Sequence, residues 1–485
     1  MEYMEYNFDT KVQYIKFRVL SEVAKLAFED NLEQGLLGIP EIISPGPNAT
    51  MRCCIYKERA ILGERIKMAI GGDDEVDNVI QVLTIACDEC PVSQMAVGDS
   101  CRGCLAHRCK RSCPKGAIDV YPDPGTTDHK AHIDLDKCVR CGKCAEVCPY
   151  NAIVKNERPC EHACRADALH MDENQKASID HEKCVHCGRC VNQCPFGAVV
   201  DKSDILSAVR LLTGSGNNQN YHVYAVVAPS IASQFHEIRL GQVVAAIKEL
   251  GFYDVVEAAL GADITAYKEA EELAERGFMT SSCCPAFVTQ IRKQFPELAK
   301  HISSNLSPMA QIARELKKED PQAKVVFIGP CIAKKAEGKE ERVKEHIDCV
   351  ITFEEMVALF AAKGVEPDQL EDEELEDASF YGRIFARSGG VTDAVAQAMK
   401  ERGLDFALNP ISCSGIDECR TALLKASKGI LKENFIEGMA CRDGCIGGPV
   451  GMLHGPKDRR QVDVYGKEAK RSTISEAVSG IHDLD

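Results

Sequence analysis

The sequence predicts a protein whose larger part is an α/β domain with parallel sheets flanked by helices, preceded by small α+β units. Two observations lead to this fold class. From residue 221 on, apolar runs such as KVVFIG and HIDCVITF alternate with helical segments, which is typical of parallel sheets. Between Cys53 and Cys194 lie 18 of the 26 cysteines, and the endings CPKGAI, CPYNAI, CRADAL and CPFGAV repeat one theme.

Changes in composition divide the chain into four segments, as expected for 485 residues, a length beyond one ordinary core. Residues 1–80 are predicted to be partly helical, because apolar residues recur there at three- and four-residue steps. Residues 81–200 form the Cys-rich module. Residues 201–220 end in the polar stretch LTGSGNNQN and are predicted to be a linker. Residues 221–485 form the α/β domain, whose functional loops are expected at the carboxyl ends of strands.

Charge and hydropathy exclude several classes of function. The net charge of −16 argues against nucleic acid as a partner, since phosphate binding needs a basic surface. No apolar run approaches the ~20 residues that span a bilayer, so no membrane association is expected. The first residues lack the features of a signal peptide, and we therefore expect a cytoplasmic protein. A reducing compartment disfavours disulfides, and the close cysteine spacing then indicates metal.

Two cysteine runs match the bacterial pattern Cys-x2-Cys-x2-Cys-x3-Cys-Pro. In this ferredoxin motif three cysteines bind one [4Fe–4S] cluster and the fourth binds the other cluster. The pattern therefore predicts one cluster on Cys138, Cys141, Cys144 and Cys194, and a second on Cys184, Cys187, Cys190 and Cys148. Zinc also binds four cysteines, but two full-length runs closed by Cys-Pro favour clusters.

The remaining cysteines of the module resemble a second, degenerate pair of runs. By the same crossover logic, one further cluster is predicted on Cys101, Cys104, Cys109 and Cys164, and another on Cys87, Cys90, Cys160 and Cys113. The eight residues are ligand candidates whatever their pairing. Several clusters in one chain predict an electron path from the surface to a buried site. The adjacent Cys53 and Cys54 are interpreted as structural or incidental.

Three further cysteine motifs lie beyond residue 220. They are TSSCCPAF with Cys283 and Cys284, GPCIAKKAE with Cys331, and EGMACRDGCIGG with Cys441 and Cys445. The first two follow apolar strands, and Pro and Gly beside all three place them on loops. Glycine lets the backbone approach a bulky cofactor closely.

In order and spacing, these motifs resemble the signature loops of [FeFe]-hydrogenases, and the resemblance covers most of residues 221–455. The residues within the motifs are similar to those of the group B branch. The resemblance implies the reaction 2H⁺ + 2e⁻ ⇌ H₂ at an H-cluster held between two lobes. That cofactor is a [4Fe–4S] cubane joined to a two-iron unit with CO, cyanide and azadithiolate ligands. The resemblance also implies maturases that build the two-iron unit, and ferredoxin or a similar redox protein as electron partner.

The resemblance assigns roles to residues of these loops. It implies cubane ligation by four cysteines, with Cys445 bridging to the two-iron unit, and it makes Cys283 the thiol that passes protons. It also implies that Lys334 and the Pro229–Ser230 loop contact the cyanides and that Met439 packs against the two-iron unit. The implied cubane ligands are Cys284, Cys331, Cys441 and Cys445. Lys335, next to Lys334, is predicted to be a surface charge.

A proton relay is also implied by the resemblance. It runs from Cys283 through Glu269, Ser303 and Glu272 to Arg276 near the surface. Glu269 and Glu272 lie about one turn apart, so they share a helix face. The sequence pattern alone favours solvent-exposed carboxylates on the surface of a helix at these two positions. Their spacing matches that of the family's relay residues, and this match reverses the preference.

Departures from the family's pattern leave the rate, the catalytic bias and the oxygen response open. Gly329 replaces Met, Met309 replaces Gln, and Phe287 replaces Trp. Cys413 and Cys419 are expected to be small hydrophobes, with a redox pair as the alternative. Two other functions were weighed: a hydrogen sensor of low turnover, and a non-catalytic electron-transfer or cluster-assembly protein. The presence of Cys283, Lys334 and Cys445 together speaks against the second.

Overall fold

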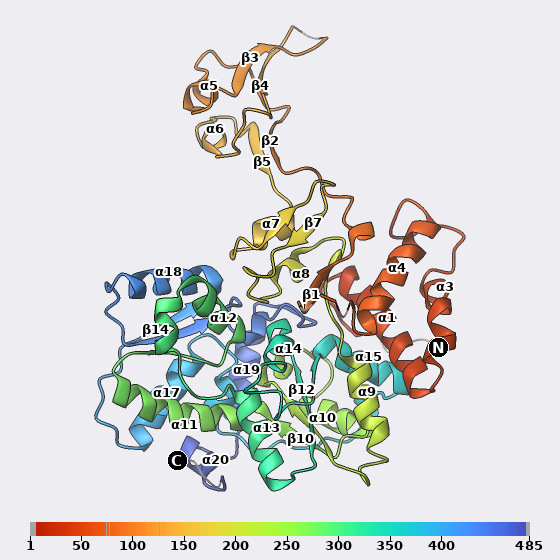
Figure 1. The fold of residues 1–485 in the computed structure, drawn as a ribbon, viewed down its shortest axis with the longest axis vertical. Coiled ribbons are helices and arrows are strands. Elements are labelled where there is room, and N and C mark those ends of the chain that lie inside the picture. Colours follow the sequence, from red (N-terminus) through yellow and green to blue (C-terminus); the bar gives the residue numbers. More distant parts are fainter. Residues whose placement is uncertain (1–5, 74, 77, 126, 482–485) are drawn as a thin grey trace.

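The computed structural model describes residues 6–73, 75–76, 78–125 and 127–481. Figure 1 shows a broad body that contains both chain ends, with a narrow cysteine-rich arm rising from it. Within the described ranges, no helix combines the length and apolar character that crossing a bilayer requires.

The body is built on two parallel sheets, as the alternation of strands and helices predicts. The first has the strand order β10-β9-β12-β13 and the second the order β11-β15-β14. The first sheet consists of β9 (Val223–Val227), β10 (Asp254–Glu257), β12 (Lys324–Gly329) and β13 (Cys349–Thr352). The second consists of β11 (Met279–Thr280), β14 (Pro410–Ser414) and β15 (Phe435–Met439).

Helices cover these sheets and supply most of the apolar cores. The first sheet shares one core with α1 (Lys11–Phe28), α10 (Leu240–Glu249), α13 (Pro308–Glu319) and α15 (Phe353–Lys363). The second sheet has one core with α11 (Ala258–Arg276), α17 (Gly390–Glu401) and α20 (Ile474–Val478), and another with α12 (Pro285–Gln294) and α18 (Ile416–Ser427). The remaining body helices are α2 (Leu32–Gly35), α3 (Ile39–Ile43), α4 (Ile55–Ala69), α14 (Ile332–Glu337), α16 (Phe380–Ile384) and α19 (Asp458–Lys467).

The segment predicted as a linker, residues 201–220, is mostly not one. It contains helix α9 (Ile205–Gly214), which begins the segment that returns the chain to the body. Ile205, Ala208, Val209 and Leu212 are buried in the same core as α1 and the first sheet. The polar Gly/Asn letters that suggested a linker occupy only the turns after this helix. The prediction was wrong because it relied on the polar residues at the end of the segment and overlooked the apolar helix face at its start.

The cysteine-rich module folds as two successive lobes. The distal lobe, residues 94–156, pairs its first and last strands, β2 (Gln94–Val97) and β5 (Ile153–Asn156), and encloses the hairpin of β3 (Ile118–Pro122) and β4 (His129–Ile133). It also holds α5 (Arg108–Ser112) and α6 (Lys143–Glu146). The proximal lobe holds β1 (Ile80–Val82), β6 (Leu169–Met171), β7 (Ala177–Ile179), β8 (Val199–Asp201), α7 (Pro159–Ala163) and α8 (Arg189–Gln193). Figure 1 shows the proximal lobe seated on the body and the distal lobe farthest from it.

An ion-pair network ties the proximal lobe to the body, and it corrects the expectation for Lys335. This side chain is buried, not a surface charge. Its ammonium group lies 3.0 Å from Asp201 at the end of β8 and 2.9 Å from Glu355 in α15. Lys16 of α1 completes the network with Asp201 and Glu354. Helix α14 begins directly after the loop of Cys331, and this position directs the side chain of Lys335 toward the proximal lobe.

Candidate functional site

Four loops that follow strands meet in one cavity between the two sheets. They leave the carboxyl ends of β9, β12, β11 and β15 and carry Pro229, Cys331, Cys283–Cys284 and Cys441 respectively. The cavity has a volume of about 90 Å³, measured as the space open to the centres of water-sized spheres. Its position fits the rule that open α/β sheets bind ligands beyond the carboxyl ends of their strands.

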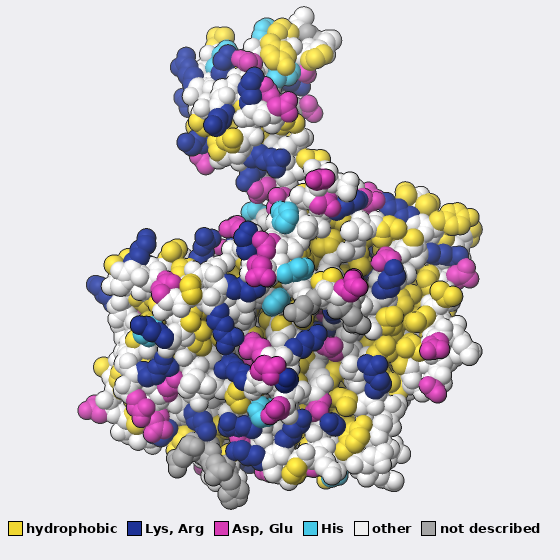
Figure 2. All heavy atoms as spheres, viewed as in Figure 1, with side chains coloured by type: hydrophobic (Ala, Val, Ile, Leu, Met, Phe, Trp, Pro, Cys, Tyr) yellow, Lys and Arg dark blue, Asp and Glu magenta, His cyan; other side chains and the backbone are white. Residues whose placement is uncertain are grey.

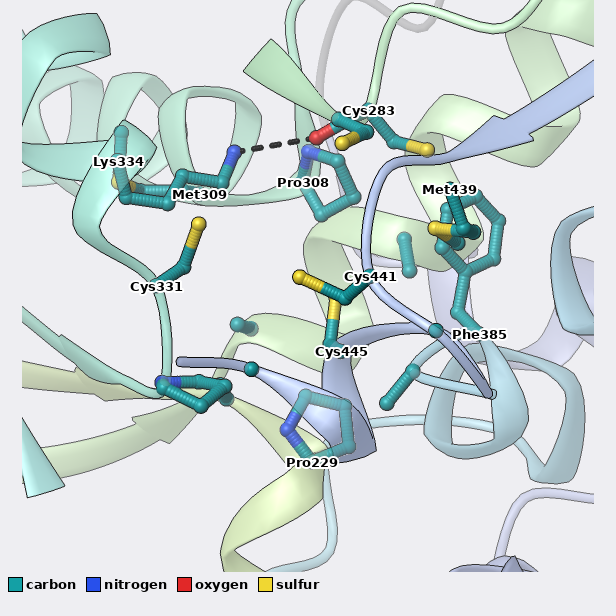
Figure 3. Close-up of a pocket in the computed structure, with 18 of the residues that line it drawn as sticks. Pro229, Cys283, Pro308, Met309, Cys331, Lys334, Phe385, Met439, Cys441 and Cys445 are labelled. Atoms are coloured by element: carbon teal, nitrogen blue, oxygen red, sulfur yellow. Dashed lines mark hydrogen bonds between the residues drawn. The ribbon is translucent and has the colours of Figure 1, made fainter. Parts of the chain in front are cut away.

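The four predicted cubane ligands all line this cavity. Figure 3 shows the side chains of Cys331, Cys441 and Cys445 directed toward a common space, and Cys284 lines the same cavity. Burial, together with the charge of neighbouring thiols, raises the pKa of Cys331 to about 11 and that of Cys445 to about 12. Thiols that close together become stable as thiolates when they bind metal.

The wall of the cavity suits a bulky cofactor shielded from water. Met309, Phe327, Phe385 and Met439 contribute apolar side chains. The hydroxyl of Ser230, on the loop of Pro229, is buried without a hydrogen-bond partner among the described residues. A buried hydroxyl is costly unless something accepts or donates its hydrogen bond. The four thiols, the apolar wall and this unpaired hydroxyl therefore fit an H-cluster, which the predicted ligands would hold.

Lys334 lines the cavity and is held by partners on three sides. Its ammonium group donates hydrogen bonds to the Cys283 carbonyl at 3.3 Å, to the Ser307 hydroxyl at 2.9 Å and to Glu337 at 2.6 Å. Burial alone would lower the pKa of Lys334, but Glu337 raises it above its ordinary value. Sequence reasoning missed Glu337. Its position three residues after Lys334 on α14 was the available signal, because such residues are neighbours on a helix.

The predicted relay residues lie together and lead outward. Cys283 is buried, and its burial and the charge of Glu269 raise its thiol pKa well above 9. Glu269 is fully buried, and burial raises its pKa to about 7, although Ser303 and Ser282 favour the ionised form. Its Oε1 atom accepts hydrogen bonds from the amide and the hydroxyl of Ser282, both at 3.4 Å, while its Oε2 atom has no hydrogen-bond partner in the described part of the chain.

The outer half of the relay is connected by hydrogen bonds. The Ser303 hydroxyl donates to Glu272 at 3.0 Å, and Arg276 donates to Glu272 at 2.5 Å. The side chains of Glu272 and Arg276 are 13% and 29% exposed, so accessibility increases along the series. Asn305, which the sequence did not single out, also donates to Glu272 at 2.8 Å.

In the module, the structure corrects the predicted pairing of cysteines. Cys138 and Cys144 share a local core with Cys101, Cys109 and Cys113 in the distal lobe. Cys194 lies instead in the proximal lobe, in one core with Cys87 and Cys160. The crossover partners thus come from the same lobe. The regular run of Cys138 pairs with the degenerate run of Cys101. By the crossover rule, Cys113 replaces Cys194 as the fourth residue of the set that begins at Cys138, and Cys148 replaces Cys164 as the fourth residue of the set that begins at Cys101.

The proximal lobe gathers the other eight cysteines. Burial is the main cause that raises the pKa of Cys160 and of Cys187. The charges of Cys194, Cys87 and Cys90 add to the shift of Cys160, and those of Cys184 and Cys164 add to the shift of Cys187, so these thiols are close neighbours. The two proximal sets are therefore Cys87, Cys90, Cys160, Cys194 and Cys164, Cys184, Cys187, Cys190. No group of three His, Cys, Asp or Glu side chains in the described ranges is placed for a single metal ion. A cubane differs, because each thiolate binds its own iron.

The proximal lobe reaches the wall of the cavity. Cys187 packs with Cys284 and Cys331 around three buried alanines. The next residue, Gly188, has φ +74°, and a Cβ atom there would lie 2.5 Å from Pro449 of the third motif. Glycine therefore allows the cysteine loop to approach the cavity directly.

Comparison with known families finds a match over the α/β part of the chain. The model of the iron only hydrogenase large subunit, C-terminal domain, matches residues 221–449, which contain both sheets and all three motifs. This part of the chain is therefore similar to the iron-only hydrogenase large-subunit family. A 4Fe-4S dicluster domain matches residues 100–152 and an LdpA Fe-S cluster-binding domain matches residues 154–205, in agreement with the two lobes.

The curated relatives match this chain to different extents. Iron hydrogenase 1 of Clostridium pasteurianum is 29% identical over 53% of this chain, which spans about half (54%) of that protein's length. The periplasmic [Fe] hydrogenase large subunit of Nitratidesulfovibrio vulgaris is 29% identical over 73% of this chain and 96% of its own length. A solved [FeFe]-hydrogenase structure from Chlamydomonas reinhardtii is 21% identical, covering 53% of this chain and 88% of its own, with a TM-score of 0.44.

Two of the departures from the family's motifs, Gly329 and Phe287, have local steric explanations. A Cβ atom at Gly329 would lie 2.7 Å from the ring of Phe327, so this aromatic ring occupies the space beside Gly329. A Cβ atom at Gly438 would lie 2.3 Å from the ring of Phe287. Glycine at these two positions is therefore matched to bulky neighbours.

Proposed function

We propose that this protein is a hydrogenase that interconverts protons, electrons and H₂ at an H-cluster in the cavity. The observation that supports this most directly is the placement of Cys283 and Lys334 beside four further cysteines in one apolar cavity. A plain cubane site has no use for the first two residues. When bound, the cofactor supplies the iron at which the bond between two hydrogens forms or breaks.

The chain's own residues control protons and water around this site. The apolar wall excludes solvent, which strengthens each remaining electrostatic contact. The raised pKa of Cys283 keeps a proton on its Sγ atom at neutral pH. Glu269, with a pKa near neutrality, is suited to exchange that proton, since general acids and bases act best near the working pH.

Electrons would travel through the cysteine-rich arm. The two distal sets lie in the lobe farthest from the body, the two proximal sets follow, and Cys187 packs against the same buried alanines as two predicted H-cluster ligands. This order supports four [4Fe–4S] clusters that act in series. We place the protein in the cytoplasm and in the group B branch, with a ferredoxin-type partner and with separate maturases for the two-iron unit.

The infrared spectrum of anaerobic, matured protein tests the cofactor. We expect sharp CO and cyanide bands that disappear in Cys445→Ala, because that cysteine is the proposed bridge to the two-iron unit. The control is Cys413→Ala, a buried thiol on β14 that does not line the cavity. Bands that are missing from the unmodified protein, with a control hydrogenase matured in parallel, would contradict the proposal.

One specific observation favours an alternative. The cytosolic Fe-S cluster assembly factor Nar1 of Kluyveromyces lactis is 36% identical over 90 residues, 19% of each chain. A non-catalytic iron–sulfur protein of this kind would show intact cubanes, no CO or cyanide bands, and no H₂ production with a reduced dye. The same infrared experiment therefore separates the two functions.

The pH dependence tests the relay. Because burial raises the pKa of Glu269 to about 7, its carboxyl loses its proton as pH rises through that value. We expect dye-driven H₂ production to fall over that interval. Glu269→Gln cannot exchange a proton, so the rate should drop by ~10²–10⁴-fold and the inflection near pH 7 should disappear. Glu275→Gln, an exposed carboxyl on the same helix, should keep both. An unchanged profile in Glu269→Gln would remove this residue from the relay.

A further inference from the structure

The distal lobe differs in charge from the rest of the molecule. Residues 94–156 contain ten Lys and Arg against seven Asp and Glu, a net charge of +3 in a chain of −16. No acidic residue occurs between Asp99 and Asp119, a stretch that holds five Lys and Arg. The most distant cluster-bearing part of the molecule is thus its basic part.

These basic side chains are exposed on one side of the lobe. The five residues of the stretch are Arg102, Arg108, Lys110, Arg111 and Lys115, and each is exposed. Lys110 pairs with Asp119. Within the described ranges the other four have no ion-pair partner. Figure 2 shows Lys and Arg gathered on the side of the lobe where Figure 1 places α5 and α6.

Exposed apolar residues stand beside the cysteines of this lobe. Leu105 is 95% exposed and Val139 is 56% exposed. Leu105 lies between Cys104 and Cys109, and Val139 between Cys138 and Cys141, the latter itself exposed. A small apolar centre within a charged rim is the usual anatomy of a protein interface. A cluster bound here would lie close to the molecular surface.

We propose that this face, defined by Arg102, Leu105, Arg108, Arg111, Lys115, Val139, Arg140 and Lys143, docks a small acidic iron–sulfur electron carrier. The proposal rests on the hydrogenase function and specifies where its electrons enter. In each encounter the reduced carrier loses one electron to a distal cluster, and two encounters supply the two electrons that one H₂ requires. Opposite charge accelerates such encounters by 10–10³-fold and makes them sensitive to salt.

The test compares two electron donors in the matured full chain. An acidic ferredoxin must dock, whereas methyl viologen, a small cationic dye, needs no such face. In Arg108→Glu/Arg111→Glu we expect kcat/KM with the reduced ferredoxin to fall at least ~10-fold at low salt. The dye-driven rate should stay within about twofold, because neither side chain touches the cavity. The matched control, Lys425→Glu/Lys428→Glu, places the same charge change on two exposed residues of the body, one in the last turn of α18 and one directly after it, and should leave both rates unchanged.

Equal ferredoxin-driven rates in the two double variants would overturn the proposal. Binding of the same ferredoxin to unmatured chain, which needs no H₂ chemistry, separates this outcome from a failure of the hydrogenase function. Weaker binding only in Arg108→Glu/Arg111→Glu supports the docking face even if no H₂ is made. Equal binding of both variants, or a short DNA duplex that binds as tightly as ferredoxin, would overturn the assignment of an acidic carrier.

Discussion

Cys283→Ser is expected to lower the rate of H₂ production by ~10²–10⁴-fold, the contribution of a positioned proton donor. The thiol lines the cavity but adjoins the predicted ligand Cys284, so it can hand over a proton without being bound to metal. A serine hydroxyl has nearly the same size, but it does not release its proton at any working pH. The CO and cyanide bands should therefore remain while turnover is lost.

The control for this variant is Cys349→Ser. Cys349 lies on β13, is buried, and has a thiol pKa raised mainly by burial, like that of Cys283. It does not line the cavity. Its replacement should leave H₂ production within about twofold of the unmodified protein. A Cys283→Ser protein that keeps most of its turnover would show that protons reach the cofactor by another route.

The sequence was informative where local patterns decide the structure. The apolar run KVVFIG is strand β12, and the run HIDCVITF contains strand β13. Parallel strands bring their carboxyl ends to one edge, so motifs that follow strands had to meet. This reasoning, together with the family's motifs, predicted the loops around the cavity.

The pairing of cysteine runs could not be predicted in the same way. All the runs share similar spacing, so no local feature says which run folds against which. Pairing is decided by strands outside the motifs. Gln94–Val97 pairs with Ile153–Asn156 and closes the distal lobe around the runs of Cys101 and Cys138. The crossover rule itself stays a prediction, and the neighbouring run to which the sequence analysis applied it was wrong.

Lys335 is the second failure, and its cause is the direction of a side chain. Lys334 and Lys335 are neighbours in sequence, yet consecutive residues of a helix point to different sides. Lys334 faces the cavity, while Lys335 faces the proximal lobe. A charged residue of a helix is usually exposed, and this expectation holds unless oppositely charged residues come from elsewhere in the chain. Asp201, which is 134 residues away, supplies that partner.

The largest expected effect on stability comes from Lys335→Met. The ammonium group lies 3.0 Å from Asp201 and 2.9 Å from Glu355, and it donates to the Lys202 carbonyl at 2.7 Å, with both carboxylates buried. Removing one partner of a buried ion pair leaves an uncompensated charge and costs about 3–5 kcal/mol. We expect a loss of this size in the free energy of unfolding, measured with a chemical denaturant and followed by far-UV circular dichroism.

The exposed neighbour Lys339→Met, on the turn after α14, is the matched control and should change the free energy of unfolding by less than about 0.5 kcal/mol. Because Asp201 ends β8 of the proximal lobe and Glu355 belongs to α15 of the body, the loss should also loosen the contact between the lobe and the cavity. Absorbance of the clusters should then disappear at lower denaturant concentration than in the control. If Lys335→Met and Lys339→Met unfold alike, Lys16 alone compensates Asp201, and the lobe is held to the body by apolar contacts such as that of Gly188 with Pro449.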